Sequence, residues 1–230
     1  MFKKKYNIID ITIPCGIDFN PYKKLLELPN DKVEKIRSID TNGWDAYSIN
    51  LTSLSGTYLE TGAHLYSEYL SLYDFPISRF CVDVLIVDVS PKNPLEHIER
   101  SELKHYASKL NPRMGFIVYT GWDSKRGESI YFEKSPHFSI EAMEWIIQQK
   151  INILGGDMPS FDDPLKPFGF LKSFFRGGKR LLLAPLKNLN FKKPIKATLM
   201  VLPLLIPKVC GAPCRAILIV EEKTSKYGGK

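Results

Sequence analysis

The chain has 230 residues, 44% of them hydrophobic, and a net charge of +7, which suits one large folded domain rather than several small modules. No segment approaches the roughly 18 apolar residues of a membrane-spanning helix, and the basic start precedes an alternating segment instead of a signal peptide's apolar run. The four cysteines are too few and too scattered for a disulfide framework. We therefore expect a soluble, cytoplasmic protein with reduced thiols and no membrane span.

Basic and acidic residues are unevenly distributed along the chain. Residues 1–163 contain 18 lysines and arginines against 23 acidic residues, whereas residues 164–220 contain 11 basic residues and no acidic one. Such a basic segment can bind nucleic acid or anionic lipid. Phenylalanines and leucines lie between its basic residues, however, and this mixture suits a protein interface as well. We favour a solvated basic face beside a subunit contact over nucleic-acid binding.

Apolar segments with period-two alternation or β-branched content predict strands. In chain order they cover residues 6–14, 44–52, 81–89, 115–120, 151–154, 180–183, 196–202 and 215–221. Between them we expect a short helical or irregular connection over 23–28, a helix from Ser101 to Leu110, and a helix over 140–150 capped by Ser139.

The irregular alternation of strands with a few helices indicates an α/β fold with a mixed sheet and flanking helices. The strands should pair in both parallel and antiparallel fashion. We assign residues 1–222 to a single domain and residues 223–230 to a flexible C-terminal tail.

Residues 53–66, with the sequence SLSGTYLETGAHLY, best suit a functional site. A predicted strand leads into this segment, and its two glycines allow a tight loop, where ligands and catalytic groups commonly lie. His64 is either a metal ligand or general base, or a hydrogen-bonded histidine in a pocket without metal. Glu60 has the same alternatives. Tyr58 fits a packing and hydrogen-bonding role better than a catalytic one.

The same segment resembles the metal-binding signature HxGTHxDxPxH of the cyclase family, which includes bacterial kynurenine formamidases and isatin hydrolases. Gly56 and Thr57 match the central GT of that signature, Glu60 stands at its aspartate, and His64 stands at its closing histidine. Leu54 and Tyr58 occupy its two leading histidine positions.

Further segments resemble this family in the same order along the chain. They are 10–12 (DIT), 120–122 (TGW), 131–132 (YF), 155–157 (GGD), 202–204 (LPL) and 211–215 (GAPCR). The resemblance therefore covers nearly the whole chain. It implies a swivelling β/β/α cyclase-like fold, usually in a homodimer or larger homo-oligomer, and metal-assisted hydrolysis of an aryl formamide or a strained cyclic amide.

The sequence departs from the family pattern at further ligand positions. Ala184 stands at the glutamate of a segment resembling ENL, and no histidine follows His137. Glu60 and His64 thus remain as candidate ligands for a divalent metal such as zinc or manganese. Such ions commonly need three or four ligands, so these two residues alone do not form a complete metal site.

Other polar and aromatic residues are candidates for secondary roles. Tyr58, Thr57, Trp122 and Asp157 are our candidates for substrate binding, although Asp157 also fits an ordinary turn. Three histidines, His97, His105 and His137, are expected at the surface. Cys210 and Cys214 are expected to be small buried residues at a turn and a strand edge.

Two functional hypotheses follow. The first is a cyclase-family hydrolase, similar to the arylformamidases, that cleaves a C–N amide or lactone bond of a small substrate through Glu60 and His64. The alternative is a catalytically inactive family member that binds a small anionic ligand or a protein partner.

Overall fold

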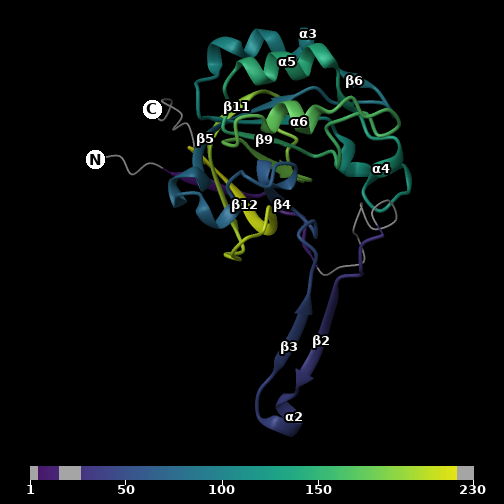
Figure 1. Ribbon diagram of the computed structural model, residues 1–230, viewed down its shortest axis with the longest axis vertical. Helices are drawn as coiled ribbons and strands as arrows, with labels where there is room; N and C mark the ends of the chain where they lie inside the picture. Colours follow the sequence, from purple (N-terminus) through teal and green to yellow (C-terminus); the bar gives the residue numbers. More distant parts are fainter. Residues whose placement is uncertain (1–4, 16–26, 222–230) are drawn as a thin grey trace, which may run out of the picture.

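The structure of the protein is a computed structural model, which describes residues 5–15 and 27–221. Its main sheet has the strand order β1-β12-β11-β5-β7-β9-β10-β4, and β4 also pairs with β12. The strands from β12 through β4 therefore close into a barrel, and β1 extends the edge of β12 (Figure 1). The bounds are β1 Tyr6–Asp10, β4 Tyr58–Thr61, β5 Cys81–Asp88, β7 Gly115–Tyr119, β9 Ile153–Gly156, β10 Leu181–Ala184, β11 Ile195–Pro203 and β12 Gly211–Glu221.

The barrel combines the two kinds of strand pairing that the sequence predicted. β5, β7, β9 and β10 run parallel to their neighbours in that order. β1, β4 and β11 pair antiparallel with β12, and β11 pairs antiparallel with β5. The mixed α/β architecture is therefore confirmed, while the proposed domain boundary at residue 222 stays a prediction and the tail 223–230 lies outside the described residues.

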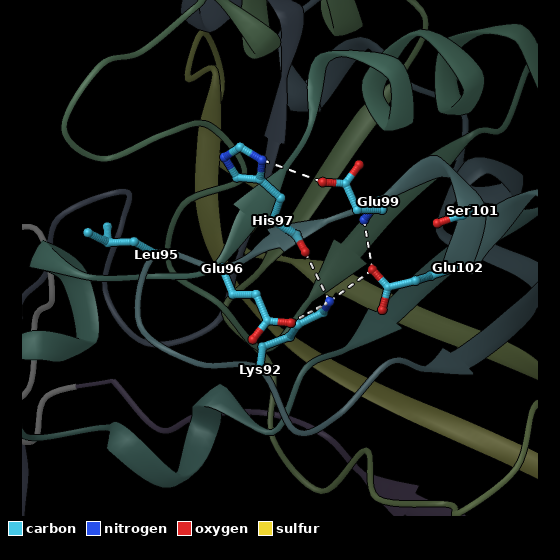
Figure 2. Close-up of a pocket in the computed structure, with 7 residues that line it drawn as sticks. All are labelled: Lys92, Leu95, Glu96, His97, Glu99, Ser101 and Glu102. Carbon is cyan, nitrogen blue, oxygen red and sulfur yellow. Dashed lines mark hydrogen bonds and ion pairs between the residues drawn. The ribbon is translucent and has the colours of Figure 1, made fainter.

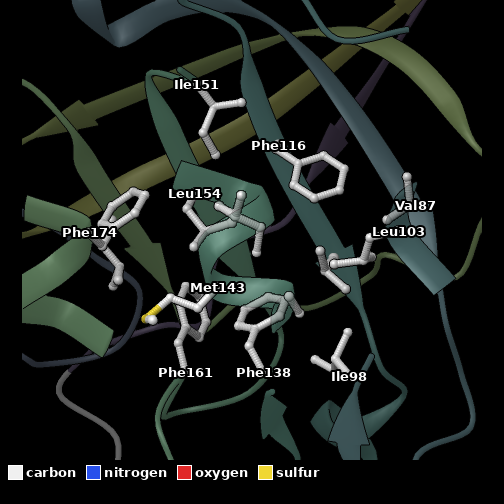
Figure 3. Packing of buried hydrophobic residues seen from close by; sticks show 14 of the residues in the cluster. Val87, Ile98, Leu103, Phe116, Phe138, Met143, Ile151, Leu154, Phe161 and Phe174 are labelled. Carbon is white, nitrogen blue, oxygen red and sulfur yellow. The ribbon is translucent and has the colours of Figure 1, made fainter. Parts of the chain in front are cut away.

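The sheet separates two apolar clusters because successive strand residues point to opposite faces. Ile117 and Leu183 belong to the cluster that fills the barrel. Phe116 and Leu154 belong to the cluster on the outer face, where helices cover the sheet (Figures 1 and 3). The helices on this side are α3 Arg100–Leu103, α5 Ile140–Gln148 and α6 Phe170–Phe175, while α4 Ile130–Glu133 lies at the edge.

The two predicted helices form with different lengths. Ser139 Oγ accepts a hydrogen bond from Ala142 N at 3.2 Å and so caps α5, as expected. The predicted helix over 101–110 is instead the single turn of α3 followed by a 3₁₀ segment, Lys104–Lys109.

Helix α6 is absent from the sequence prediction, which treated its region as a connection. Asp162 explains its start, because its carboxylate accepts hydrogen bonds from Phe168 N, Gly169 N and Phe170 N at 2.8–3.0 Å. Phe170 and Phe174 are then buried in the outer cluster, which stabilises this short helix by packing rather than propensity. No helix in the described part of the chain is long and apolar enough to cross a membrane.

Residues 32–50 form an arm that projects from the body (Figure 1). It consists of β2 Lys32–Arg37, α2 Ile39–Asn42 at its tip, and β3 Ala46–Asn50, which pairs antiparallel with β2. The predicted strand 44–52 therefore exists as β3, but it belongs to a separate two-stranded sheet, and β2 was not predicted. A third small sheet pairs β6 His97–Ile98 with β8 His137–Phe138.

The buried carboxylate of Asp157 joins the ends of β7 and β9. Its Oδ1 accepts hydrogen bonds from Thr120 N at 2.9 Å and Thr120 Oγ1 at 2.8 Å, and its Oδ2 accepts from Trp122 N at 2.8 Å. Burial outweighs these bonds and raises the pKa of Asp157 to about 6. The side chain thus fixes the loop that follows β7.

We expect Asp157→Asn to lower the free energy of unfolding by about 2–4 kcal/mol, because the asparagine N–H group would face buried donors that keep no acceptor. Urea denaturation followed by circular dichroism measures this change. Glu144→Gln, on the exposed side of α5, is the matched control and should change stability by about 0.5 kcal/mol or less. Equal stability of the two variants would contradict the role given to Asp157.

Candidate functional site

The central residues of segment 53–66 form strand β4 rather than the loop that the sequence suggested. β4 is paired on both edges, so that Glu60 stands opposite Leu182 of β10 and Gly211 of β12. Leu59 points into the barrel. Because strand residues alternate, Tyr58 and Glu60 point to the outer face. Only 3% of Glu60 is exposed, so a carboxyl group is held in the interior.

His64 is brought back toward Glu60 by a short turn. The 3₁₀ segment Gly62–His64 begins where Thr61 Oγ1 accepts a hydrogen bond from Ala63 N at 3.2 Å. His64 Nδ1 consequently lies 3.5 Å from Glu60 Oε1. The imidazole remains 39% exposed, so it is the member of the pair that a solute can reach.

Cys210 is a third member of this cluster, which we call the Glu60–His64–Cys210 cluster. Thr61 N donates a hydrogen bond to Cys210 O at 2.8 Å, just before β12 begins. Cys210 Sγ lies 3.9 Å from His64 Nδ1. Sequence analysis placed Cys210 at an ordinary turn, since no local signal indicates that a residue 146 positions away joins the site.

Burial makes the cluster electrically neutral near pH 7. Glu60 Oε1 has no hydrogen-bond partner within the described residues, and desolvation raises the pKa of Glu60 to about 8. Desolvation also lowers the pKa of His64. The pKa of Cys210 is raised by burial and, secondarily, by the nearby Glu60. The cluster therefore presents a protonated carboxyl, a neutral imidazole and a thiol.

Tyr58 and Ala184 occupy facing positions on neighbouring strands. The register of β4 and β10 pairs Ala184 with Tyr58, and both are buried. Side chains directly opposite one another in an antiparallel pair lie about 4.5–5.5 Å apart at Cβ. In the family pattern, Tyr58 stands at a histidine position and Ala184 at a glutamate position. These two positions are thus neighbours that hold a phenol ring and a methyl group.

Thr57 has a structural role in positioning β4. Its Oγ1 accepts a hydrogen bond from Ile13 N at 2.8 Å and donates one to Pro185 O at 2.5 Å. Gly56 precedes it with φ +60°, and a Cβ there would lie 2.6 Å from Ile13 O. Only glycine fits at this close approach of two backbone segments.

Trp122 and Asp157, predicted to bind substrate, lie in a second network rather than in the Glu60–His64–Cys210 cluster. Trp122 N donates to Asp157, and Trp122 Nε1 donates to Tyr131 O at 2.7 Å. Tyr131 in turn donates its hydroxyl proton to Asp157 O at 2.8 Å. These contacts assign both residues to the interior, and their role in substrate binding stays a prediction.

His137 is buried, so its predicted surface location is wrong. It stands opposite His97 in the pairing of β6 with β8, with ring centroids 4.7 Å apart. Its Nε2 lies 3.8 Å from Asp163 Oδ2. The surface location was predicted from the polar residues near His137 in the sequence. The pairing of β6 with β8 joins residues 40 positions apart, which local sequence does not indicate.

A pocket of about 560 Å³ lies beside this histidine pair and away from segment 53–66 (Figure 2). Lys92 is its main charged donor, with Nζ bonded to Glu96 Oε1 at 3.0 Å, His97 O at 2.9 Å and Glu102 Oε2 at 2.8 Å. An ammonium group has three N–H donors, so these contacts use all of them. The pocket is lined by Lys92, Leu95, Glu96, His97, Glu99, Ser101 and Glu102.

The side chains present do not fit a complete metal site. Among residues 5–15 and 27–221, no group of three or more His, Cys, Asp and Glu side chains is arranged to hold a metal ion. Glu60 and His64 supply two donors, and the Cys210 thiol beside them is not arranged with them as a third, whereas catalytic zinc sites use three protein ligands. Leu54, Tyr58 and Ala184 add no imidazole or carboxylate.

Solved structures confirm the cyclase-like fold. The chain is similar to isatin hydrolase A from Labrenzia aggregata, solved bound to benzyl benzoate, with a TM-score of 0.82 and 21% identity over 94% of each chain. It is also similar to a predicted metal-dependent hydrolase from Bacillus stearothermophilus, with a TM-score of 0.76, 16% identity and coverage of 94% of this chain and 98% of that one.

Sequence comparison extends to one bacterial relative and to a family model. An uncharacterized protein of Haemophilus influenzae is 28% identical over 126 residues, which cover 52% of this chain and 88% of the relative. A family model described as "Putative cyclase" matches residues 9–163, from β1 through the loop after β9. This match includes all of segment 53–66 and more than half of the chain, which therefore belongs to the cyclase family.

Proposed function

We propose that this protein is a hydrolase that cleaves a C–N amide or lactone bond in a small cyclic or acylated substrate, such as an aryl formamide. The observation that carries the proposal is the buried Glu60 carboxyl, whose Oε1 has no hydrogen-bond partner among the residues that the structure describes and lies 3.5 Å from the accessible His64. A buried acid of this kind destabilises the fold, and perturbed pKa values concentrate at functional sites. The similarity to an isatin hydrolase and to a predicted metal-dependent hydrolase supports the reaction class.

His64 is the proposed general base. Its lowered pKa keeps the imidazole neutral, and an Nδ1–H directed at Glu60 Oε1 leaves Nε2 free to accept a proton. Water then loses a proton to Nε2 as its oxygen bonds to the substrate carbonyl carbon. The tetrahedral intermediate collapses as the C–N or C–O bond breaks, and the imidazolium returns the proton to the leaving nitrogen or oxygen.

Glu60 orients the imidazole in this scheme, and its Oε1 is an acceptor whether or not the carboxyl is protonated. The 3.5 Å separation from Nδ1 is longer than a strong hydrogen bond, as is common before substrate binds. The Cys210 thiol packs against the imidazole, and its raised pKa makes it a poor nucleophile.

A divalent metal, which the family resemblance implies, has no step in this scheme because the donor set around Glu60 is incomplete. Two of the similar structures are of a predicted and a potential metal-dependent hydrolase. The metal question therefore needs a direct experiment, given below.

The second candidate is a catalytically inactive protein that binds a small anion at the same cluster. It is favoured by Tyr58 and Ala184, which face each other at two positions of the family's ligand pattern. The accessible His64 imidazole would donate a hydrogen bond to a carboxylate ligand. We also propose a cytoplasmic homodimer or larger homo-oligomer.

We expect His64→Ala to reduce kcat/KM for an active amide or lactone substrate by about 100-fold or more, because the proton acceptor is lost. Glu60→Gln should lower kcat by a smaller factor, since glutamine keeps an acceptor oxygen. Hydrolysis of aryl formamides, isatin and lactones, followed by absorbance, is the measurement. His105→Ala at an exposed histidine is the control. Full activity of His64→Ala would contradict the base assignment, and no hydrolysis by the wild type would favour the anion-binding candidate.

Removal of metal should leave the reaction intact. We expect dialysis of the wild type against a strong chelator to change neither the rate of hydrolysis nor the melting temperature, because two side-chain donors hold zinc or manganese weakly. Elemental analysis of the dialysed protein verifies the removal. Activity that disappears on dialysis and returns with zinc or manganese would show that the scheme above lacks an essential ion.

The buried carboxyl also predicts a pH dependence of stability. The pKa of Glu60 is raised from 4.5 to about 8 in the folded state, so the folded protein retains a proton that the unfolded chain releases. The contribution of this group to stability is thus present below pH 4.5 and is lost as the pH rises to 8. We expect Glu60→Gln, which cannot ionise, to gain melting temperature relative to wild type across this interval.

Thermal unfolding at a series of pH values measures the difference, with Glu144→Gln as the exposed control. A constant difference between Glu60→Gln and wild type from pH 4.5 to 8 would mean that the Glu60 pKa is not raised.

A further inference from the structure

Five segments of the chain meet at the end of the barrel where β5, β7, β9, β10 and β12 begin. Each segment precedes one of these strands, and in that order they are residues 65–79, 111–114, 149–152, 176–180 and 204–209. Hydrogen bonds between segments join Leu72 to Val209, Tyr69 to Gly177, Arg79 to Asn152 and Arg113 to Lys150. The five segments therefore form one continuous surface, which we call the basal surface.

The basal surface carries an excess of positive charge. Its basic residues are Arg79, Arg113, Lys150, Arg176, Lys179, Arg180 and Lys208, and its acidic residues are Glu68 and Asp74, for a net charge of +5. Within the described part of the chain, none of the seven basic residues forms an ion pair with a carboxylate. A cation also suits the C-terminus of a helix, but only Lys150 and Arg176 closely follow α5 and α6.

Two arginines show that this charge lacks compensation. The Arg79 guanidinium donates hydrogen bonds to Asn152 Oδ1 and Lys179 O, which are both neutral acceptors. Burial and, secondarily, the positive charge of Arg113 lower the pKa of Arg79. Because like charges repel, an anion bound beside the two guanidinium groups would stabilise both of them. The basal surface thus favours a negatively charged partner.

Large apolar side chains project from the same surface. Leu205 and Ile77 are 79% and 72% exposed, more than any other large hydrophobic residue in the described ranges. Leu70, Tyr73, Leu204 and Ile206 are 43–53% exposed. The loop that contains Leu205, drawn in yellow-green, projects below the body in Figure 1. Single exposed leucines are ordinary, but a gathered apolar patch beside polar residues is typical of a surface that binds a protein or a membrane.

We propose that the basal surface binds the headgroup layer of an anionic lipid bilayer. Its aliphatic side chains, with Ile77 and Leu205 foremost, would enter the boundary between headgroups and acyl chains. Its basic side chains would contact the phosphate and carboxylate groups of the lipids. Affinity of this kind rises with the apolar area buried and with the attraction between basic residues and anionic lipid, and the basal surface supplies both.

The combination of charge and apolar exposure separates this partner from two others. A nucleic acid would use the basic residues, but its phosphate backbone would leave Ile77 and Leu205 in water. A second basal surface would cover those side chains, but it would bring a net charge of +5 against an equal one. An anionic bilayer matches the positive charge and the apolar side chains together.

This proposal goes beyond the proposed hydrolysis and does not rest on it. His64 directly precedes the first segment of the basal surface, and Cys210 directly follows the last one. A protein bound in this way would therefore hold the Glu60–His64–Cys210 cluster close to the lipid interface.

The test is sedimentation of the full-length protein with lipid vesicles. We expect the wild type to sediment with vesicles of phosphatidylcholine that contain about 30% phosphatidylserine, an anionic lipid, and to remain in solution with pure phosphatidylcholine. Salt at about 0.5 M should release much of the bound protein, because it screens the attraction between the basic residues and the lipid.

Replacing two basic residues tests the electrostatic part. The double variant Arg113→Gln with Lys150→Gln should lower the partition coefficient on anionic vesicles about 25-fold, since each basic residue near such a surface contributes about fivefold. Arg126→Gln with Lys134→Gln is the matched control, because these exposed residues follow β7 at the other end of the barrel. The control should bind as the wild type does.

Replacing two aliphatic residues tests the apolar part. Ile77→Ser with Leu205→Ser should lower the partition coefficient about tenfold or more, because two side chains no longer leave water on binding. Ile140→Ser with Leu165→Ser, at exposed positions outside the basal surface, is the matched control. Melting temperatures verify that all four double variants are folded.

Several outcomes would overturn the proposal. They are a wild type that sediments with neither kind of vesicle or equally with both, and unchanged binding by either basal-surface variant. Gel-shift assays with DNA and RNA, and the mass of the protein in solution, cover the other partners. A nucleic-acid complex without vesicle binding, or a mass that falls in Ile77→Ser with Leu205→Ser without vesicle binding, would assign the surface to those partners instead. None of these readouts involves hydrolysis, so their failure is separable from failure of the proposed activity.

Discussion

Pairing of β4 on both of its edges is the constraint on which the rest of the structure depends. β10 and β12 lie on either side of this four-residue strand, and their pairing with it closes the barrel. Closure leaves β4 no unpaired edge, and all four of its residues are buried. Glu60 stands between Leu182 and Gly211 in these pairings, and Cys210, just before β12, is brought beside His64 although it lies far away in the sequence.

The chemical character of the candidate site follows from this burial. A carboxyl group removed from water keeps its proton unless a cation or several donors compensate, and Glu60 Oε1 has no hydrogen-bond partner among the described residues. Asp157 illustrates the contrast, because it is buried as deeply but accepts several hydrogen bonds, and its pKa rises less. Asp157, with its several hydrogen bonds, therefore stabilises the fold, whereas Glu60 destabilises it.

The arm presents the opposite situation, with apolar side chains left in solvent. Its alternation of apolar and polar residues is as regular as that of a sheet packed on a core, yet its neighbours in the chain do not cover it. The barrel thus buries polar groups at the Glu60–His64–Cys210 cluster, whereas the arm leaves apolar groups exposed.

Local patterns in the sequence predicted the mixed α/β class, most of the barrel strands and the cap of α5 at Ser139, and they indicated Glu60 and His64 as candidate site residues of one segment. These features depend on residues within about one or two turns or strands of each other, where periodicity and capping are decisive. The resemblance at residues 53–66 also indicated the cyclase family, which the family model confirmed. Only the tertiary structure revealed that segment 53–66 contains a strand, that α6 begins at Asp162, that His137 is buried, and that Cys210 contacts His64. Each of these depends on a contact between distant parts of the chain, and burial by such contacts, not local sequence, sets the protonation of Glu60.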